Sequence, residues 1–169
     1  MRESYGETVA TLNSDEVMVF GSNLQGFHGA GSAGFASFGV SGNRWREFGY
    51  LDKPFGWKGK WNVKGISEGL QEGTEGKSYA IPTVLRAGAK RSRTQEEITK
   101  SIRKMYKTAA DHPEWKFLVA GSAAGDKPNL NGYTHEEMCA MYREAGPVPG
   151  NVVFSGSYTG LIFGVSGEV

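Results

Sequence analysis

A glycine-rich segment directly after a short apolar run constrains this chain more than any other feature. The apolar residues Val17–Phe20 predict a buried strand, and the segment Gly21–Gly34 that follows contains five glycines. Small residues among the glycines allow a helix to begin there without crowding. The free backbone N–H groups and the positive dipole end of such a helix favour an anion. The sequence therefore predicts a site for phosphate or pyrophosphate where this strand ends.

The composition indicates one soluble globular domain over residues 1–169. Hydrophobic residues make up 38% of the chain and aromatic residues 12%, which is enough for a substantial core. The 25 glycines are about twice the usual share, and we expect them to serve loops and turns. The net charge of +1 does not suggest a protein that binds nucleic acid non-specifically.

The cysteine count indicates a reducing compartment. Cys139 is the single cysteine, which excludes an internal disulfide and a zinc site built from several cysteines. The first residues are polar, and no apolar run is long enough for a signal peptide or a membrane span. We therefore expect a cytoplasmic protein without a membrane partner.

Short apolar runs alternate with amphipathic helical patterns, which predicts an α/β fold with a mixed or parallel central sheet. A capping box of Thr94 and Glu97 begins one helix, which we expect to end near His112. A second capping box, Thr134 with Glu137, begins another. Three further strands are expected, at residues 78–83, 115–120 and 151–154.

The segments between these elements are expected to be irregular. Residues 44–77 are interpreted as a loop-rich insertion with one hairpin at about 57–61, and residues 86–93 as a basic loop. Pro82 is expected to stop the second strand and leave Thr83 exposed at the edge of the sheet. The glycine- and serine-rich tail, 155–169, is interpreted as an edge strand or a mobile end.

A second loop of small residues, Gly121–Gly125, follows the strand predicted at residues 115–120. Ligands of open α/β sheets bind at the carboxyl ends of the strands. Two such loops side by side would hold a diphosphate between them, with Gly29–Gly31 on one flank and Ser122–Gly125 on the other. The pattern therefore predicts a nucleotide-like small molecule as the ligand.

Four segments of the chain resemble the small macrodomain-like proteins common in bacteriophage and bacterial genomes. They read VFGSNLQGFHGAGSAGFA, GISEGLQEGTEGKSYAIPT, HPEWKFLVAG and NGYTHEEM, and the resemblance covers roughly residues 17–154, with gaps. It implies a three-layer α/β/α fold that binds ADP-ribose or a relative, free or attached to a macromolecule. It also implies that Asn23 lies by the distal ribose, that Gly26–Gly31 wraps the diphosphate, and that Gly121–Gly125 with Gly132-Tyr133 closes the other side. In a phage-encoded protein, the compartment would be the host cytoplasm.

The resemblance and the two loops together yield one set of candidate site residues. The candidate ligand-binding residues are Gly21, Ser22, Asn23, Gly26, Phe27, His28, Gly29, Ala30, Gly31, Thr83, Gly121, Ser122, Ala123, Ala124, Gly125 and Tyr133. The candidate catalytic residues are Asn23 and His28. His28 could act as an acid or base on a ribose hydroxyl or on water, or it could simply hydrogen-bond within its loop. In this class the phosphate of the substrate can activate the water, so both a hydrolase and a non-catalytic reader stay open.

Several other residues have structural interpretations. Glu136 and Glu137 suit the first turn of a helix, and Cys139 suits packing. The three histidines lack metal-ligand spacing, so we expect no metal and no cofactor. The basic residues of 90–107 are typical of a solvated helix face. Three tryptophans, Trp45, Trp57 and Trp61, could form a surface for single-stranded nucleic acid, but we favour their interpretation as a lid over the nucleotide.

A dinucleotide site is the sharpest alternative. Residues Gly29–Gly34 match the pattern G-x-G-x-x-G of NAD-binding Rossmann proteins. In that fold the first glycine follows the strand almost at once, whereas eight residues separate Phe20 from Gly29 here. No apolar strand precedes Glu47 or Asp52, the acids at the right distance for the ribose. A P-loop is excluded, since no Gly-Lys-Ser/Thr follows the loop.

Overall fold

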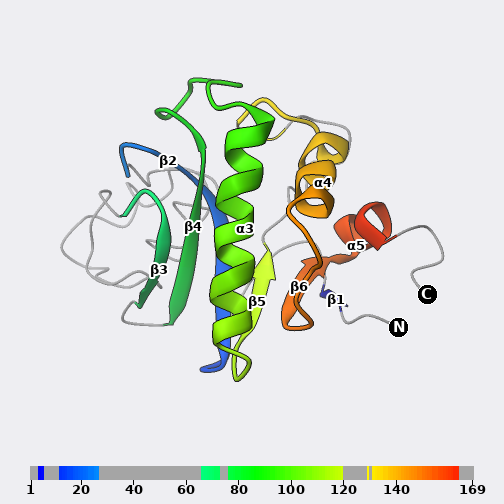
Figure 1. Ribbon diagram of the computed structural model, residues 1–169. Coiled ribbons are helices and arrows are strands. Elements are labelled where there is room, and N and C mark those ends of the chain that lie inside the picture. Colours follow the sequence, from blue (N-terminus) through cyan, green and yellow to red (C-terminus); the bar gives the residue numbers. More distant parts are fainter. Residues whose placement is uncertain are drawn as a thin grey trace, which may run out of the picture.

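The computed structural model (Figure 1) describes residues 4–5, 12–26, 66–72, 76–119, 129 and 131–163, and strands and helices alternate in it from residue 77 onward. The strands are β1 (Ser4–Tyr5), β2 (Glu16–Asn23), β3 (Gly69–Glu72), β4 (Lys77–Val84), β5 (Lys116–Val119) and β6 (Val152–Ser155). The helices are α3 (Gln95–Asp111), α4 (His135–Glu144) and α5 (Gly156–Phe163). The predicted α/β class with a mixed sheet is confirmed.

The sheet has the strand order β1-β6-β5-β2-β4-β3. β2 lies between β5 and β4 and is parallel to both. β6 is parallel to β5 and to β1, whereas β3 is antiparallel to β4. Parallel strands need long crossover connections. α4 lies in the connection between the neighbours β5 and β6, and α3 lies in the connection from β4 to β5, which passes β2. The carboxyl ends of β2, β4 and β5 therefore meet at one edge of the sheet.

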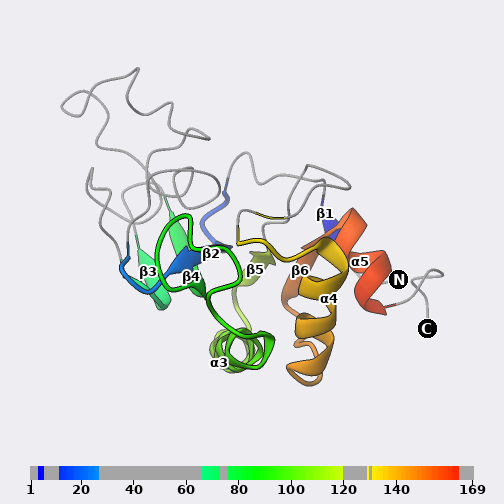
Figure 2. The same cartoon turned by 90° about the horizontal axis from the view of Figure 1, so that it is seen from above.

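Both faces of the central strands are buried. Val17 and Val19 belong to the core cluster with Ile98 and Ile102 of α3, and Figure 2 shows α3 and α4 on the same side of the sheet. The alternate residues of β2, such as Phe20, are buried as well. Burial on both faces explains why Val17–Phe20 reads as a continuous apolar run rather than as an alternating one.

Both predicted capping boxes are present. Thr94 donates its N–H to the Glu97 carboxylate at 2.8 Å, and its hydroxyl accepts the N–H of Glu97 at 3.1 Å. Thr134 and Glu137 make the same pair of bonds at 2.9 and 3.1 Å. The first helix has His112 as its C-cap, as expected from the sequence. No helix in the described ranges is long and apolar enough to cross a membrane.

The prediction for Pro82 and Thr83 was wrong. β4 continues to Val84, and both residues are buried inside the sheet rather than exposed at its edge. β3 pairs with β4 only as far as Ala80, so Pro82 lies beyond the point where β3 would need its N–H. On the other side, the register with β2 shifts between Ser22 and Asn23, which leaves Thr83 as an extra residue in β4.

Three further elements differ from the prediction. Residues 156–163, expected as an edge strand or a mobile end, form α5, whose Tyr158 and Ile162 are buried in the core. β3 lies inside the stretch expected to be loops, and β1 lies in the polar N-terminal segment. The hairpin expected at 57–61 lies outside the described residues.

Candidate functional site

The candidate site lies at the carboxyl edge of β2, β4 and β5. Residues Glu16–Val19 of β2 pair in parallel with Lys116–Val119 of β5. The last pair in this register is Val19 with Val119, and in the sequence each glycine-rich segment begins two residues after its member of that pair, at Gly21 and at Gly121. The sequence identified each loop separately, and the strand order makes their starting points neighbours.

The end of β2 carries three of the candidate residues. Gly21 is exposed, whereas Ser22 and Asn23 are buried. The Ser22 hydroxyl donates to the carbonyl of Ser67 at 2.5 Å, so this serine ties β2 to the segment before β3. A Cβ added at Gly21 would lie 3.4 Å from the Thr83 hydroxyl, which is the nearest group to it.

A tight turn follows β2. Gly26 donates its N–H to the carbonyl of Asn23 at 3.0 Å, and Leu24 donates to Val84 at 3.1 Å. Gly26 is buried and has φ +73°, a conformation that favours glycine. The chain thus turns sharply at the first residue of the loop predicted to wrap the diphosphate.

Thr83 lies against the same turn of the chain. Its hydroxyl donates a long hydrogen bond of 3.4 Å to the carbonyl of Ser22. Thr83 is the extra residue of a β-bulge, because the register of β4 with β2 shifts beside it. Such bulges re-aim side chains and are frequent beside functional sites. The structure therefore brings Thr83 next to three consecutive candidate residues, Gly21, Ser22 and Asn23, from which it is about 60 positions away in the sequence.

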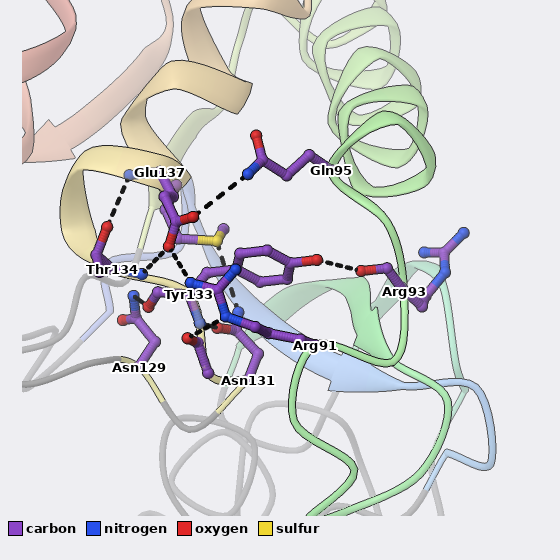
Figure 3. Close-up of polar contacts among 10 residues, drawn as sticks. Arg91, Arg93, Gln95, Asn129, Asn131, Tyr133, Thr134 and Glu137 are labelled. Carbon is purple, nitrogen blue, oxygen red and sulfur yellow. Dashed lines mark hydrogen bonds and ion pairs between the residues drawn. The ribbon is translucent and has the colours of Figure 1, made fainter.

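Tyr133 is held by protein groups on several sides (Figure 3). Its hydroxyl donates to the carbonyl of Arg93 at 2.5 Å, and its N–H donates to the side-chain oxygen of Asn131 at 2.8 Å. The Arg91 guanidinium lies 4.6 Å from the centre of its ring. The tyrosine predicted to contact ligand is thus also an anchor between two loops.

The other candidate residues lie outside the described residues, so their predicted roles stay predictions. They are Phe27, His28, Gly29, Ala30, Gly31, Gly121, Ser122, Ala123, Ala124 and Gly125.

Glu137 has two tasks. Beside capping α4, its carboxylate lies 2.6 Å from Nη2 of Arg91. The hydrogen bond from the Thr134 backbone, and then the hydrogen bond from Arg91, lower the pKa of the Glu137 carboxyl below its ordinary value. The structural interpretation of Glu137 is confirmed, whereas nothing in the sequence pattern indicated its ion pair with Arg91.

Cys139 and the described histidines have packing contacts. Cys139 is fully buried, and burial raises the pKa of its thiol to about 12. His112 stacks on Trp115, and His135 meets Tyr158 edge-on at 5.3 Å. Nε2 of His135 is buried without a hydrogen-bond partner. Within the described ranges, no group of three or more His, Cys, Asp or Glu residues could hold a metal ion.

The basic group of residues 90–107 is partly used inside the fold. Arg93 donates to the carbonyl of Pro82, and Arg103 donates to that of Ala145. Lys107 pairs with Asp111 one helical turn away at 3.6 Å. Arg93 thus connects the loop before α3 to β4, and Arg103 connects α3 to the end of α4, which the interpretation as a solvated helix face did not include.

Comparison with known protein families, with characterised proteins and with solved structures found no match to this chain.

Proposed function

We propose that this chain binds ADP-ribose or a related nucleotide at the carboxyl edge of the sheet, in a three-layer, macrodomain-like α/β/α fold. The observation that carries the proposal is the parallel pairing of β2 with β5. It starts two glycine-rich segments from neighbouring positions at the edge where α/β sheets bind their ligands.

The shape of the chain at this edge supports a closely approaching ligand. Gly21 exposes backbone without a side chain, and the turn at Gly26 bends the chain as it leaves β2. Backbone N–H groups in such loops favour phosphate oxygens. A diphosphate between two loops is the ligand chemistry that fits both.

The proposed function is binding, and an enzyme with this site would in addition hydrolyse an ADP-ribosyl bond. The substrate of a hydrolase would be ADP-ribose attached to a macromolecule, whereas a reader would sequester a free nucleotide. Turnover of an ADP-ribosylated protein separates the two, because a reader binds without releasing product.

The test is isothermal titration of the purified protein with ADP-ribose, NAD and AMP in parallel. Saturable binding of ADP-ribose in preference to NAD supports the proposal. Binding of NAD instead supports a dinucleotide site, because the G-x-G-x-x-G pattern would then be the better interpretation. Failure of all three nucleotides to bind overturns the proposal.

A further inference from the structure

Arg91 joins the loop between β4 and α3 to the turn before α4 (Figure 3). Its backbone N–H donates to the carbonyl of Asn131 at 2.7 Å, and its Nε donates to the carbonyl of Gly132 at 3.1 Å. The guanidinium also lies over the ring of Tyr133, at 4.6 Å from the ring centre. Arg91 therefore contacts three consecutive residues, 131–133, which lie about forty positions later in the chain.

Glu137 completes this contact from the other side. One oxygen of its carboxylate accepts from Arg91 at 2.6 Å and from the N–H of Thr134 at 2.9 Å. The second oxygen accepts from Gln95 at 3.4 Å. The carboxylate thus connects Gln95 at the start of α3, Thr134 before α4, and Arg91. Its bond with Arg91 is charge-assisted.

The backbone has a positive φ on both sides of this contact, at Arg91 and at Gly132. Arg91 has φ +54°, and no other non-glycine residue in the described ranges has a positive φ. Gly132 has φ +90°, and a Cβ there would lie 2.9 Å from the Cβ of Lys90. Glycine adopts a positive φ readily, whereas for Arg91 this conformation is unfavourable. Non-glycine residues in such conformations persist where contacts over-determine them, and they cluster at functional sites.

The turn that contains residues 131–133 lies next to the proposed site in the sequence and in the fold. Residues 129–133 follow the segment that carries Gly121–Gly125 and that begins where β5 ends. Within the turn, Gly132 donates to Asn129 at 2.8 Å, and Asn129 donates to Tyr133 at 2.9 Å. The other partner, the loop 85–94, begins where β4 ends, beside the bulge at Thr83.

We infer that Arg91 and Glu137 form a clasp that positions residues 131–133 for nucleotide binding, and that the affinity for ADP-ribose depends on this clasp. The inference rests on the proposed function. Arg91 and Glu137 are positioning residues here: they act through residues 131–133, because Nε and Nη2 of Arg91 and both carboxylate oxygens of Glu137 hydrogen-bond to protein groups.

The test compares Arg91→Ala, Arg91→Lys and Glu137→Gln with two matched controls. Arg86→Ala removes an exposed arginine from the same loop. Glu97→Gln changes the capping-box glutamate of α3, which corresponds to Glu137 of α4 but does not pair with Arg91. The measurements are the Kd for ADP-ribose, the thermal midpoint, and hydrogen exchange of the Gly132 and Tyr133 amides.

We expect Arg91→Ala to raise the Kd on the order of ten-fold, and Glu137→Gln and Arg91→Lys to raise it less. Both amides should exchange faster in all three variants, and the controls should match the wild type in Kd and exchange. The double variant of Arg91→Ala and Glu137→Gln should lose little more affinity than Arg91→Ala alone, because the two residues act as a unit.

A lower thermal midpoint with an unchanged Kd in Arg91→Ala would overturn the inference, since the contact would then be purely structural. If Arg91→Ala does not fold, Arg91→Lys and Glu137→Gln decide by the same criteria. If the wild-type protein does not bind ADP-ribose, the proposed function and the dependence of affinity fail together. Unchanged exchange in the Arg91 variants would overturn the clasp itself, whatever the wild type binds.

Discussion

The hydroxyl of Tyr133 donates a hydrogen bond of 2.5 Å to the backbone carbonyl of Arg93. Tyr133 is buried, with 4% of its surface exposed, and it begins the entry into α4, whereas Arg93 precedes α3. This bond and the contact of Arg91 with the tyrosine ring join the amino ends of the two helices on one side of the sheet.

Tyr133→Phe should lower the free energy of unfolding by about 1 kcal/mol, because a partly buried hydrogen bond is lost and the ring is kept. The affinity for ADP-ribose should change little, since the hydroxyl is directed to Arg93. Urea unfolding and calorimetry measure the two quantities. Tyr106→Phe is the matched control: it removes a buried hydroxyl that donates to the carbonyl of Tyr142 at 2.6 Å. A large loss of affinity in Tyr133→Phe would show that the hydroxyl binds ligand.

Asn23→Ala should weaken ADP-ribose binding by up to about ten-fold in a reader, the value of roughly one hydrogen bond. In a hydrolase it should reduce turnover more than affinity. Asn23 is buried and already has a partner within the chain, so unfolding must be measured beside binding. Asn13→Ala makes the same change at an exposed position just before the same strand. Equal affinity of the Asn23→Ala and Asn13→Ala variants for ADP-ribose would show that Asn23 does not contact the distal ribose.

Gly29→Val or Gly31→Val should abolish binding of ADP-ribose and leave the protein folded. The reason is the predicted contact of this loop with the diphosphate, where a branched side chain would occupy the space of a phosphate. Gly150→Val is the control, because a Cβ at Gly150 meets nothing within 4 Å. Retained affinity, checked by titration beside circular dichroism of each variant, would place the site elsewhere.

The stability of the protein should fall in acid partly through Glu137. Its folded-state pKa lies below the ordinary value of 4.5, first because of the hydrogen bond from the Thr134 backbone. Its contribution is therefore present above about pH 4.5 and is lost as the pH falls through the lowered pKa. Thermal midpoints of Glu137→Gln should consequently depend less on pH in this range than those of the wild type. Glu136→Gln, which removes a neighbouring carboxylate, is the comparison; an identical acid response of Glu137→Gln and the wild type would contradict the prediction.

Cys139 should not react with a thiol reagent while the protein is folded. Its side chain is fully buried, and burial raises the pKa of the thiol to about 12, so the reactive thiolate is scarce at neutral pH. One thiol per chain should react once denaturant unfolds the protein. Rapid labelling of the native protein at the rate of the unfolded chain would show that Cys139 is accessible.

Much of the secondary structure could be predicted because its causes are local. Each capping box places its two partners three residues apart, so Thr94–Glu97 and Thr134–Glu137 are readable without the fold. The apolar run Val17–Phe20 is equally readable, since a strand buried on both faces needs no alternation. The tail was misread because glycine and serine indicate turns, whereas the burial of Tyr158 and Ile162 against the core stabilises a helix there.

The candidate site was predictable only in part. The glycine-rich loops could be named from the pattern of the chain itself, whereas Asn23 and Tyr133 were named through the resemblance to macrodomain-like proteins. The Arg91–Glu137 pair could not, since its members are 46 positions apart and no spacing rule links them. Asn129, Asn131 and Gly132 were a usable signal, because residues of these types favour a turn immediately before a helix cap.

The sequence by itself determined the strand at Val17–Phe20 and the starts of α3 and α4, since the burial of apolar runs and capping act over a few residues. The tertiary structure alone decided that Pro82 stays inside β4, because that depends on where β3 ends. It alone decided that β2 and β5 are neighbours, and that Arg91 meets Glu137. Such contacts depend on which distant segments pack together, and packing is a property of the whole fold rather than of any local pattern.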